Sequence, residues 1–150
     1  MTQYVVRDKE QNLLRAIKAY REALKVRALS TFPIGYAATQ NNLGNAYASI
    51  AEVRDREQNL QGAIQAYREA LKVYSLSKFP ISYGGVNFNL GTVYLNLGEA
   101  ELRDTKAKAK ALEKAKAAFK ESIRVFEQEN MEDWLDQVQD ALDMLKKATL

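Results

Sequence analysis

The stretch VRDKEQNLLRAIKAYREALKV at residues 6–26 recurs at residues 53–73 as VRDREQNLQGAIQAYREALKV. Extended to residues 6–50 and 53–97, the two copies align without a gap, 47 residues apart, and 27 of the 45 aligned positions are identical. A fixed period of this length is typical of proteins built from stacked structural repeats. The sequence therefore predicts a repeat protein.

Each copy reads as two helices separated by a Phe-Pro step. Apolar residues recur three and four positions apart, as on one face of an amphipathic helix. Phe32-Pro33 and Phe79-Pro80 end one helix and open the next, because the residue before Pro avoids the helical region and Pro suits a first helical turn. Asp8 is expected to cap the first helix and Gly98 to close the fourth. We expect helices at about residues 8–30, 33–51, 55–77 and 80–97.

The last third of the chain continues the helical pattern in diverged form. Residues 102–128 echo residues 63–73 and are expected to start at an Asp104 cap. Residues 131–148 place an apolar face opposite a row of aspartates, as expected of a helix that ends a stack of repeats in water. The predicted fold class is all-α, an α-solenoid of about six antiparallel helices. It forms a single domain of residues 1–150, with close repeats 8–52 and 53–98, a diverged repeat helix 102–128 and a capping helix 131–148.

Composition argues against catalysis. The chain has no His and no Cys, so the commonest general base, the commonest transition-metal ligand and thiolate chemistry are all missing. No Gly-rich phosphate loop is present, and the acidic residues fall on predicted solvent faces. We expect no enzyme activity, no cofactor and no metal. With no membrane span and no secretory signal in the sequence, the cytoplasm is the default location.

Two short patterns alternate along the chain. LGxxY occurs at residues 43–47 and 90–94, and AxxxYxxAL at residues 16–24 and 63–71, with the variant AxxxFxxSI at residues 115–123. In this alternation, which covers residues 8–128, the chain resembles the tetratricopeptide repeat family. The resemblance implies helix-turn-helix repeats that serve as a protein-interaction module or scaffold.

Two departures from the family pattern affect this interpretation. The period of 47 residues exceeds the family's period of about 34, so longer helices are expected, like those of the long-repeat branch that includes kinesin light chains. The chain also begins on a helix of the second type. It is therefore interpreted either as a segment of a longer array or as a module whose first helix is covered by another copy.

By the resemblance, the first helix of each repeat lines a concave groove that holds a segment of a partner protein. A carboxamide both donates and accepts hydrogen bonds, so Asn side chains can hold a peptide backbone regardless of its sequence. The alternative is that these polar residues are only solvated or serve packing within the repeat. The candidate peptide-binding residues are Asn41, Asn42, Asn45, Ser49, Phe88, Asn89, Thr92 and Asn96.

Two other functions are compatible with parts of the sequence. Self-association, with the first helix docked on or swapped with a second chain, would make the protein a homo-oligomer. Nucleic-acid binding through the basic side of the fifth helix is less favoured, because no aromatic residue interleaves the Lys and Arg residues for base stacking. The row Asp133, Asp136, Asp140 and Asp143 lies along one helix side, which indicates a solvent face and not a metal site.

Overall fold

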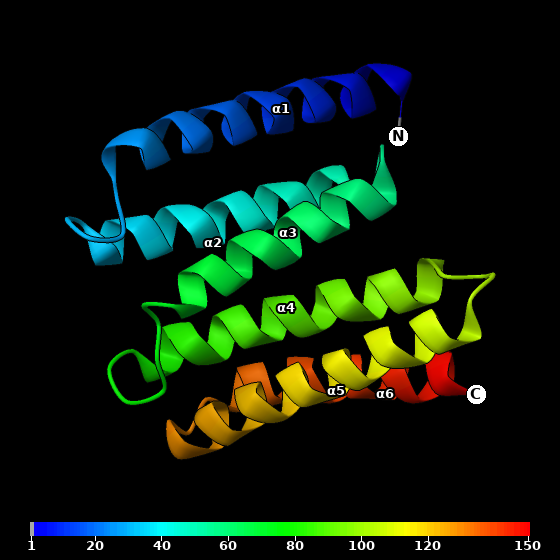
Figure 1. The fold of residues 1–150 in the computed structure, drawn as a ribbon. Coiled ribbons are helices and arrows are strands. Elements are labelled where there is room, and N and C mark those ends of the chain that lie inside the picture. Colours follow the sequence, from blue (N-terminus) through cyan, green and yellow to red (C-terminus); the bar gives the residue numbers. More distant parts are fainter. Residues whose placement is uncertain (1) are drawn as a thin grey trace. The chain divides into compact units, whose positions relative to one another are not determined.

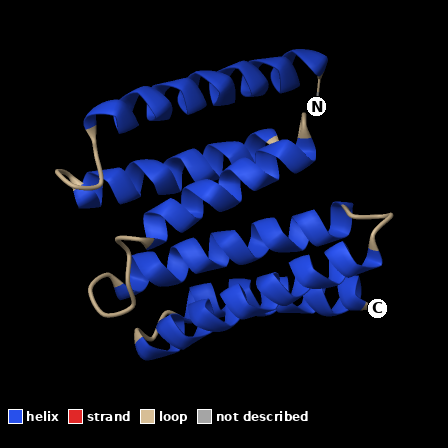
Figure 2. Cartoon of the chain, in the orientation of Figure 1, coloured by secondary structure: helices blue, strands red, loops and turns tan. Residues whose placement is uncertain are grey.

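The computed structural model describes residues 2–150 and is all-α over that range, which confirms the predicted class (Figures 1 and 2). Helices account for the regular structure of the described residues, and no strand is present among them. In chain order the six helices of this range are α1 (Gln3–Val26), α2 (Pro33–Ile50), α3 (Arg56–Leu71), α4 (Pro80–Ala100), α5 (Thr105–Gln128) and α6 (Glu132–Thr149).

Three helices, α2, α4 and α5, start at the residues that the sequence predicted. Pro33 and Pro80 occupy the first turns of α2 and α4, where a missing backbone N–H costs nothing. The Asp104 carboxylate accepts hydrogen bonds from the backbone N–H groups of Lys106 at 2.9 Å and Ala107 at 3.0 Å. Asp104 is therefore the predicted cap of α5.

Four other helix ends differ from the prediction. The first helix starts at Gln3, so Asp8 lies inside α1 and does not cap it. No Pro or Gly interrupts the residues before Asp8, so helical hydrogen bonding extends backwards to Thr2. Gly98 lies inside α4, which continues to Ala100. At the other end of the pattern, α1 and α3 stop earlier than expected, at Val26 and Leu71.

The described chain packs as two compact units, Met1–Val73 and Tyr74–Leu150. In the first unit α1 packs against α2 and α2 against α3; in the second, α4 packs against α5 and both contact α6. The packing therefore pairs α2 with α3 and α4 with α5, whereas the sequence repeat 53–98 pairs α3 with α4. Within each unit, the antiparallel helices fit the predicted solenoid class (Figure 1).

The first unit is held together where α2 meets its two neighbours. Ile17 of α1 and Ala66 of α3 join Leu43, Ala46 and Ile50 of α2 in one buried cluster. This cluster contains apolar side chains from all three helices, so its burial orients α2 between α1 and α3.

The second unit has a more aromatic core. Phe119 and Phe126 of α5 are fully buried, and their rings lie 6.0 Å from Phe88 and 5.5 Å from Trp134 respectively. The Phe88 and Trp134 rings meet edge to face at 6.2 Å, which links α4 directly to α6. Trp134 is thus part of this core although its side chain remains 37% exposed.

Candidate binding surface

Close contacts of α2 and α4 with their partner helices position the predicted binding residues. Gly44 of α2 faces the Tyr67 ring, and a Cβ atom added to Gly44 would come within 2.5 Å of that ring. Gly91 of α4 faces Phe119 in the same way, at 2.6 Å. Only Gly permits such an approach, so LGxxY marks a point of close approach between each helix and its neighbour. The Asn-rich sides of α2 and α4 are oriented by these contacts.

Three of the predicted residues lie together in the first unit. They line an open hollow of about 250 Å³ between α1 and α2. Residues from α1 supply its apolar floor, and α2 supplies its polar wall. The hollow is lined by Leu13, Ala16, Tyr20, Asn42, Asn45, Ala46 and Ser49.

The Asn residues of this wall differ in how they are held. Asn42 is exposed, so its carboxamide faces solvent. Asn45 is also exposed, but its Oδ1 accepts a hydrogen bond of 2.7 Å from the Tyr67 hydroxyl. Burial raises the pKa of Tyr67 well above its usual value of 10.0, so the hydroxyl stays protonated and keeps donating. Asn45 is thereby fixed in place, while Asn42 is available to a ligand.

Asn41 lies outside the hollow. Its side chain is half-buried, and within the described residues its Oδ1 is buried without a hydrogen-bond partner. An unsatisfied buried oxygen costs stability. Asn41 is therefore the one predicted residue of α2 that the structure does not bring to the hollow.

The side chains of the four predicted residues of α4 already contact other residues of the protein. The Phe88 ring packs against Phe119 and Trp134, so it stabilises the second unit. The Thr92 hydroxyl donates to the Phe88 carbonyl oxygen at 3.1 Å. Asn89 and Asn96 are half-buried and already interact with other residues. A ligand would therefore find fewer available groups here than on α2.

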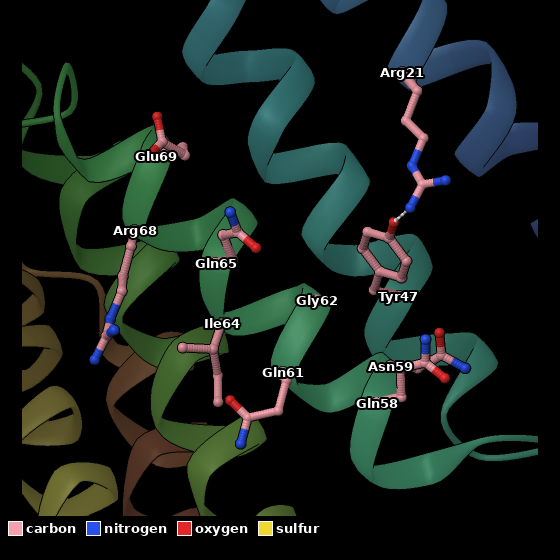
Figure 3. Close-up of a pocket in the computed structure, with 10 residues that line it drawn as sticks. All are labelled: Arg21, Tyr47, Gln58, Asn59, Gln61, Gly62, Ile64, Gln65, Arg68 and Glu69. Carbon is pink, nitrogen blue, oxygen red and sulfur yellow. Dashed lines mark hydrogen bonds between the residues drawn. The ribbon is translucent and has the colours of Figure 1, made fainter.

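A second, larger hollow escaped the sequence reasoning. It has a volume of about 710 Å³ and is lined by residues of α2 and α3, with Arg21 of α1 at its edge (Figure 3). Arg21 reaches over to donate a hydrogen bond to the Tyr47 hydroxyl, and the Tyr47 ring lies against Gly62 (Figure 3). Carboxamides dominate the rest of the lining, namely Gln58, Asn59, Gln61 and Gln65.

A signal for this second hollow was present in the repeat itself. The two copies agree closely over residues 8–26 and 55–73, yet three of their differences are Leu14 to Gln61, Arg15 to Gly62 and Lys18 to Gln65. All three of the later residues line the hollow. Differences between near-identical copies thus marked a surface that a search for shared motifs passed over.

Charged groups at the edge of the α2–α3 pair form a small network. The Glu69 carboxylate accepts a hydrogen bond from the Tyr36 hydroxyl and pairs with Lys72. The bond from Lys72, followed by that from Tyr36, lowers the pKa of Glu69 below its usual 4.5. In the second unit the Tyr83 hydroxyl donates to Glu121 at 2.7 Å. The same aromatic-to-carboxylate contact therefore joins each helix pair.

The remaining charged surfaces carry no converging site. The cationic residues of α5 are exposed except for the half-buried Lys108, and Lys114 lies 5.4 Å over the Tyr94 ring centroid. The α6 aspartates are exposed too, and within residues 2–150 no group of acidic side chains converges as a metal site would require. None of the helices in that range has the length and apolar character needed to cross a membrane.

Comparison of the chain with protein-family models, with curated proteins and with solved structures gave no match. The likeness to the tetratricopeptide repeat is therefore a resemblance carried by its motifs. The contacts of Gly44 with Tyr67 and of Gly91 with Phe119 give those motifs a physical role in this chain. Its function has to be argued from the hollows themselves.

Proposed function

We propose that this protein is an interaction module that binds a peptide segment of a partner protein in the hollow between α1 and α2. The observation that carries the proposal is the pairing of an apolar floor with an exposed carboxamide. Leu13 and Tyr20 offer apolar surface, and Asn42 offers one donor group and one acceptor beside it. Such a combination suits a peptide, which presents side chains and backbone polar groups together.

The larger hollow between α2 and α3 is a weaker candidate. Several of its polar groups are already used, because Arg21 bonds to Tyr47 and Glu69 bonds to Tyr36 and Lys72. A ligand there would have to replace existing hydrogen bonds, which reduces the net gain. The tetratricopeptide repeat resemblance adds to the proposal, since the helix bearing LGxxY is the one expected to face the ligand.

Peptide display on the immobilised full-length protein tests the proposal. Selected peptides should lose about tenfold in affinity for Asn42→Ala, because one hydrogen bond contributes about 1 kcal/mol or more. Gln61→Ala is the matched control, since it removes a carboxamide from the other hollow. Circular dichroism first establishes that both variants are folded. Peptides that bind all three proteins equally, or that depend on Gln61 instead, would overturn the assignment to the α1–α2 hollow.

A further inference from the structure

Helices α1 and α3 are two copies of one helix placed in different surroundings. Over residues 8–26 and 55–73 the copies are identical at 15 of 19 positions. In the first unit α3 is packed by α2, which in turn packs against α1. The environment of α3 therefore reports what the same side chains bind when another helix lies against them.

In α3, the face toward α2 is specific in its chemistry. Tyr67 is only 2% exposed, with its ring against Gly44 and its hydroxyl bonded to Asn45. Ala66 is buried in the cluster shared with α2. Glu69, paired with Lys72, receives the Tyr36 hydroxyl at the rim. Helix α2, which covers this face, thus supplies Tyr36, then Gly44 eight residues later and Asn45 directly after that Gly.

In α1 the identical residues are open. Ala19, the counterpart of Ala66, is exposed, and Tyr20, the counterpart of Tyr67, is only partly buried and lines the α1–α2 hollow. Glu22 pairs with Lys25 at 2.8 Å, as Glu69 does with Lys72, but it has no Tyr hydroxyl bonded to it within the described residues. Within the first unit, α1 packs against α2 alone.

The second unit shows how the pattern adapts. Phe119 has no hydroxyl, and the residue after Gly91 is Thr92, whose own hydroxyl bonds within α4. Lys114 stands where α3 has Gly62, and its ammonium lies over the ring of Tyr94, three residues after Gly91. Helix α1 carries Tyr20, which has a hydroxyl to donate, and it carries Arg15 at the position of Gly62 in α3. Its partner helix should therefore have a hydrogen-bond acceptor directly after the Gly and an aromatic residue three positions after the Gly.

From this correspondence we infer that α1 binds an α-helix of another polypeptide that carries the α2 pattern: Tyr, Gly eight residues later, Asn directly after the Gly, and Tyr three residues after the Gly. The Gly lies on the Tyr20 ring, and the Tyr20 hydroxyl donates to the Asn. This inference rests on the proposed function, because it specifies the ligand of the same hollow as a helix and not an extended segment.

Binding of labelled synthetic peptides to the full-length protein, followed by fluorescence anisotropy, tests the inference. The probe has the sequence of residues 33–51, which contains the α2 pattern. The same peptide with Gly44→Leu should bind at least tenfold more weakly, because the leucine side chain meets the Tyr20 ring. A peptide of residues 80–98, which carries Thr92 in place of the Asn, should bind more weakly than the probe.

Two variants of the protein locate the contact. Ala19→Arg adds a long side chain at an exposed position and should abolish binding without harming the fold. Val5→Arg adds the same side chain at an exposed position of α1 that precedes the repeated stretch, and it should bind normally. Equal binding of the Gly and Leu peptides, or equal binding by both variants, would overturn the inference.

The remaining outcomes separate this inference from the proposed function. Display-selected peptides that depend on Asn42 but tolerate a central Pro would be extended, so the function would stand and the helical ligand would be wrong. Absence of binding by every peptide and every library would overturn both. Sedimentation that shows a dimer abolished by Ala19→Arg would identify a second copy as the occupant and overturn the assignment to a separate helix.

Discussion

At the scale of single residues, two glycines determine how closely the helices approach. Gly44 and Gly91 face aromatic rings at distances that leave no room for a Cβ atom. Gly85, by contrast, has open space around it, with no neighbouring atom within 4 Å of the position that a Cβ atom would take. The same residue type therefore has opposite consequences in α2 and in the first turns of α4, which makes a matched pair of substitutions possible.

Gly44→Ala should lower the free energy of unfolding by about 1–3 kcal/mol, the usual range for overpacking a close contact. Gly85→Ala should raise it by roughly 0.5–1 kcal/mol, because Ala is the better helix former and meets no neighbour. Urea unfolding followed by circular dichroism measures both. A Gly44→Ala protein as stable as the wild type would show that the Tyr67 ring can move aside.

Tyr67→Phe should lower the free energy of unfolding by about 1 kcal/mol. It removes the hydroxyl that donates a hydrogen bond to Asn45 and leaves the packing of the ring unchanged. Asn45→Ala should cost a similar amount, and the double variant little more than either single one, if the two groups act together. Tyr4→Phe, at a side chain that is 80% exposed, is the control and should have no effect. Additive losses in the double variant would contradict the pairing.

At the scale of helix pairs, a Tyr-to-Glu hydrogen bond recurs at the edge of each close contact. It joins Tyr36 to Glu69 between α2 and α3, and Tyr83 to Glu121 between α4 and α5. Burial and the bonded carboxylate raise the pKa of both tyrosines, so each stays a donor at neutral pH. Each contact therefore ties the two helices of its pair together at one point.

The Glu69 contact predicts a pH dependence. Since the folded state lowers the pKa of Glu69, its stabilisation is present above the usual value of 4.5 and is lost as the pH falls through the lowered value. Wild type should exceed Glu69→Gln in unfolding free energy by about 0.5–1 kcal/mol at pH 7, and the two should converge under acid conditions.

Glu22→Gln is the matched control for this pH series. Glu22 has the same Lys three residues later, and its pKa is lowered by Lys25, but no Tyr hydroxyl of the described residues bonds to it. Its substitution should change stability less than Glu69→Gln at pH 7, and both effects should vanish under acid conditions. Chemical unfolding at pH 7, 5 and 3 measures both series. Equal effects of the two substitutions would show that the Tyr36 contact contributes nothing.

At the scale of the whole molecule, each compact unit contains its own buried cluster. The first has Leu43 and Ile50 at its centre, and the second has Phe119 and Phe126. The single Trp of the chain, Trp134, lies in the second cluster. Its fluorescence therefore reports on one unit, while circular dichroism reports on the helices of both.

Gly44→Ala should shift the unfolding midpoint measured by circular dichroism and leave the midpoint of Trp134 fluorescence nearly unchanged. Gly91→Ala, which disturbs the contact with Phe119, should shift the fluorescence midpoint and also part of the circular dichroism transition, because circular dichroism detects both units. Urea titrations read by both probes on the same samples make the comparison. Equal shifts of both probes in both variants would show that the two units unfold as one cooperative body.

Much of the local structure could be predicted because its signals are local. Pro33 and Pro80 lie in the first turns of α2 and α4, as Pro favours in any helix. Asp104 caps α5 by accepting a hydrogen bond from Lys106, two residues away. The Asp8 cap was wrong because nothing in the preceding residues stops a helix, and a potential cap is used only where a helix begins. The α2–α3 hollow was missed because most of its lining lies on α3 and is marked only by differences between the two copies, whereas shared motifs were used to find the site.

The sequence by itself determined the all-α class and the repeat, because the periodicity of apolar residues is a property of the chain. Only the tertiary structure decided which copy of a repeated surface is open. Tyr20 and Tyr67 have nearly the same sequence neighbours, yet α2 covers Tyr67 and leaves Tyr20 partly exposed. Burial depends on what lies against a side chain, and an identical stretch of residues cannot encode that difference.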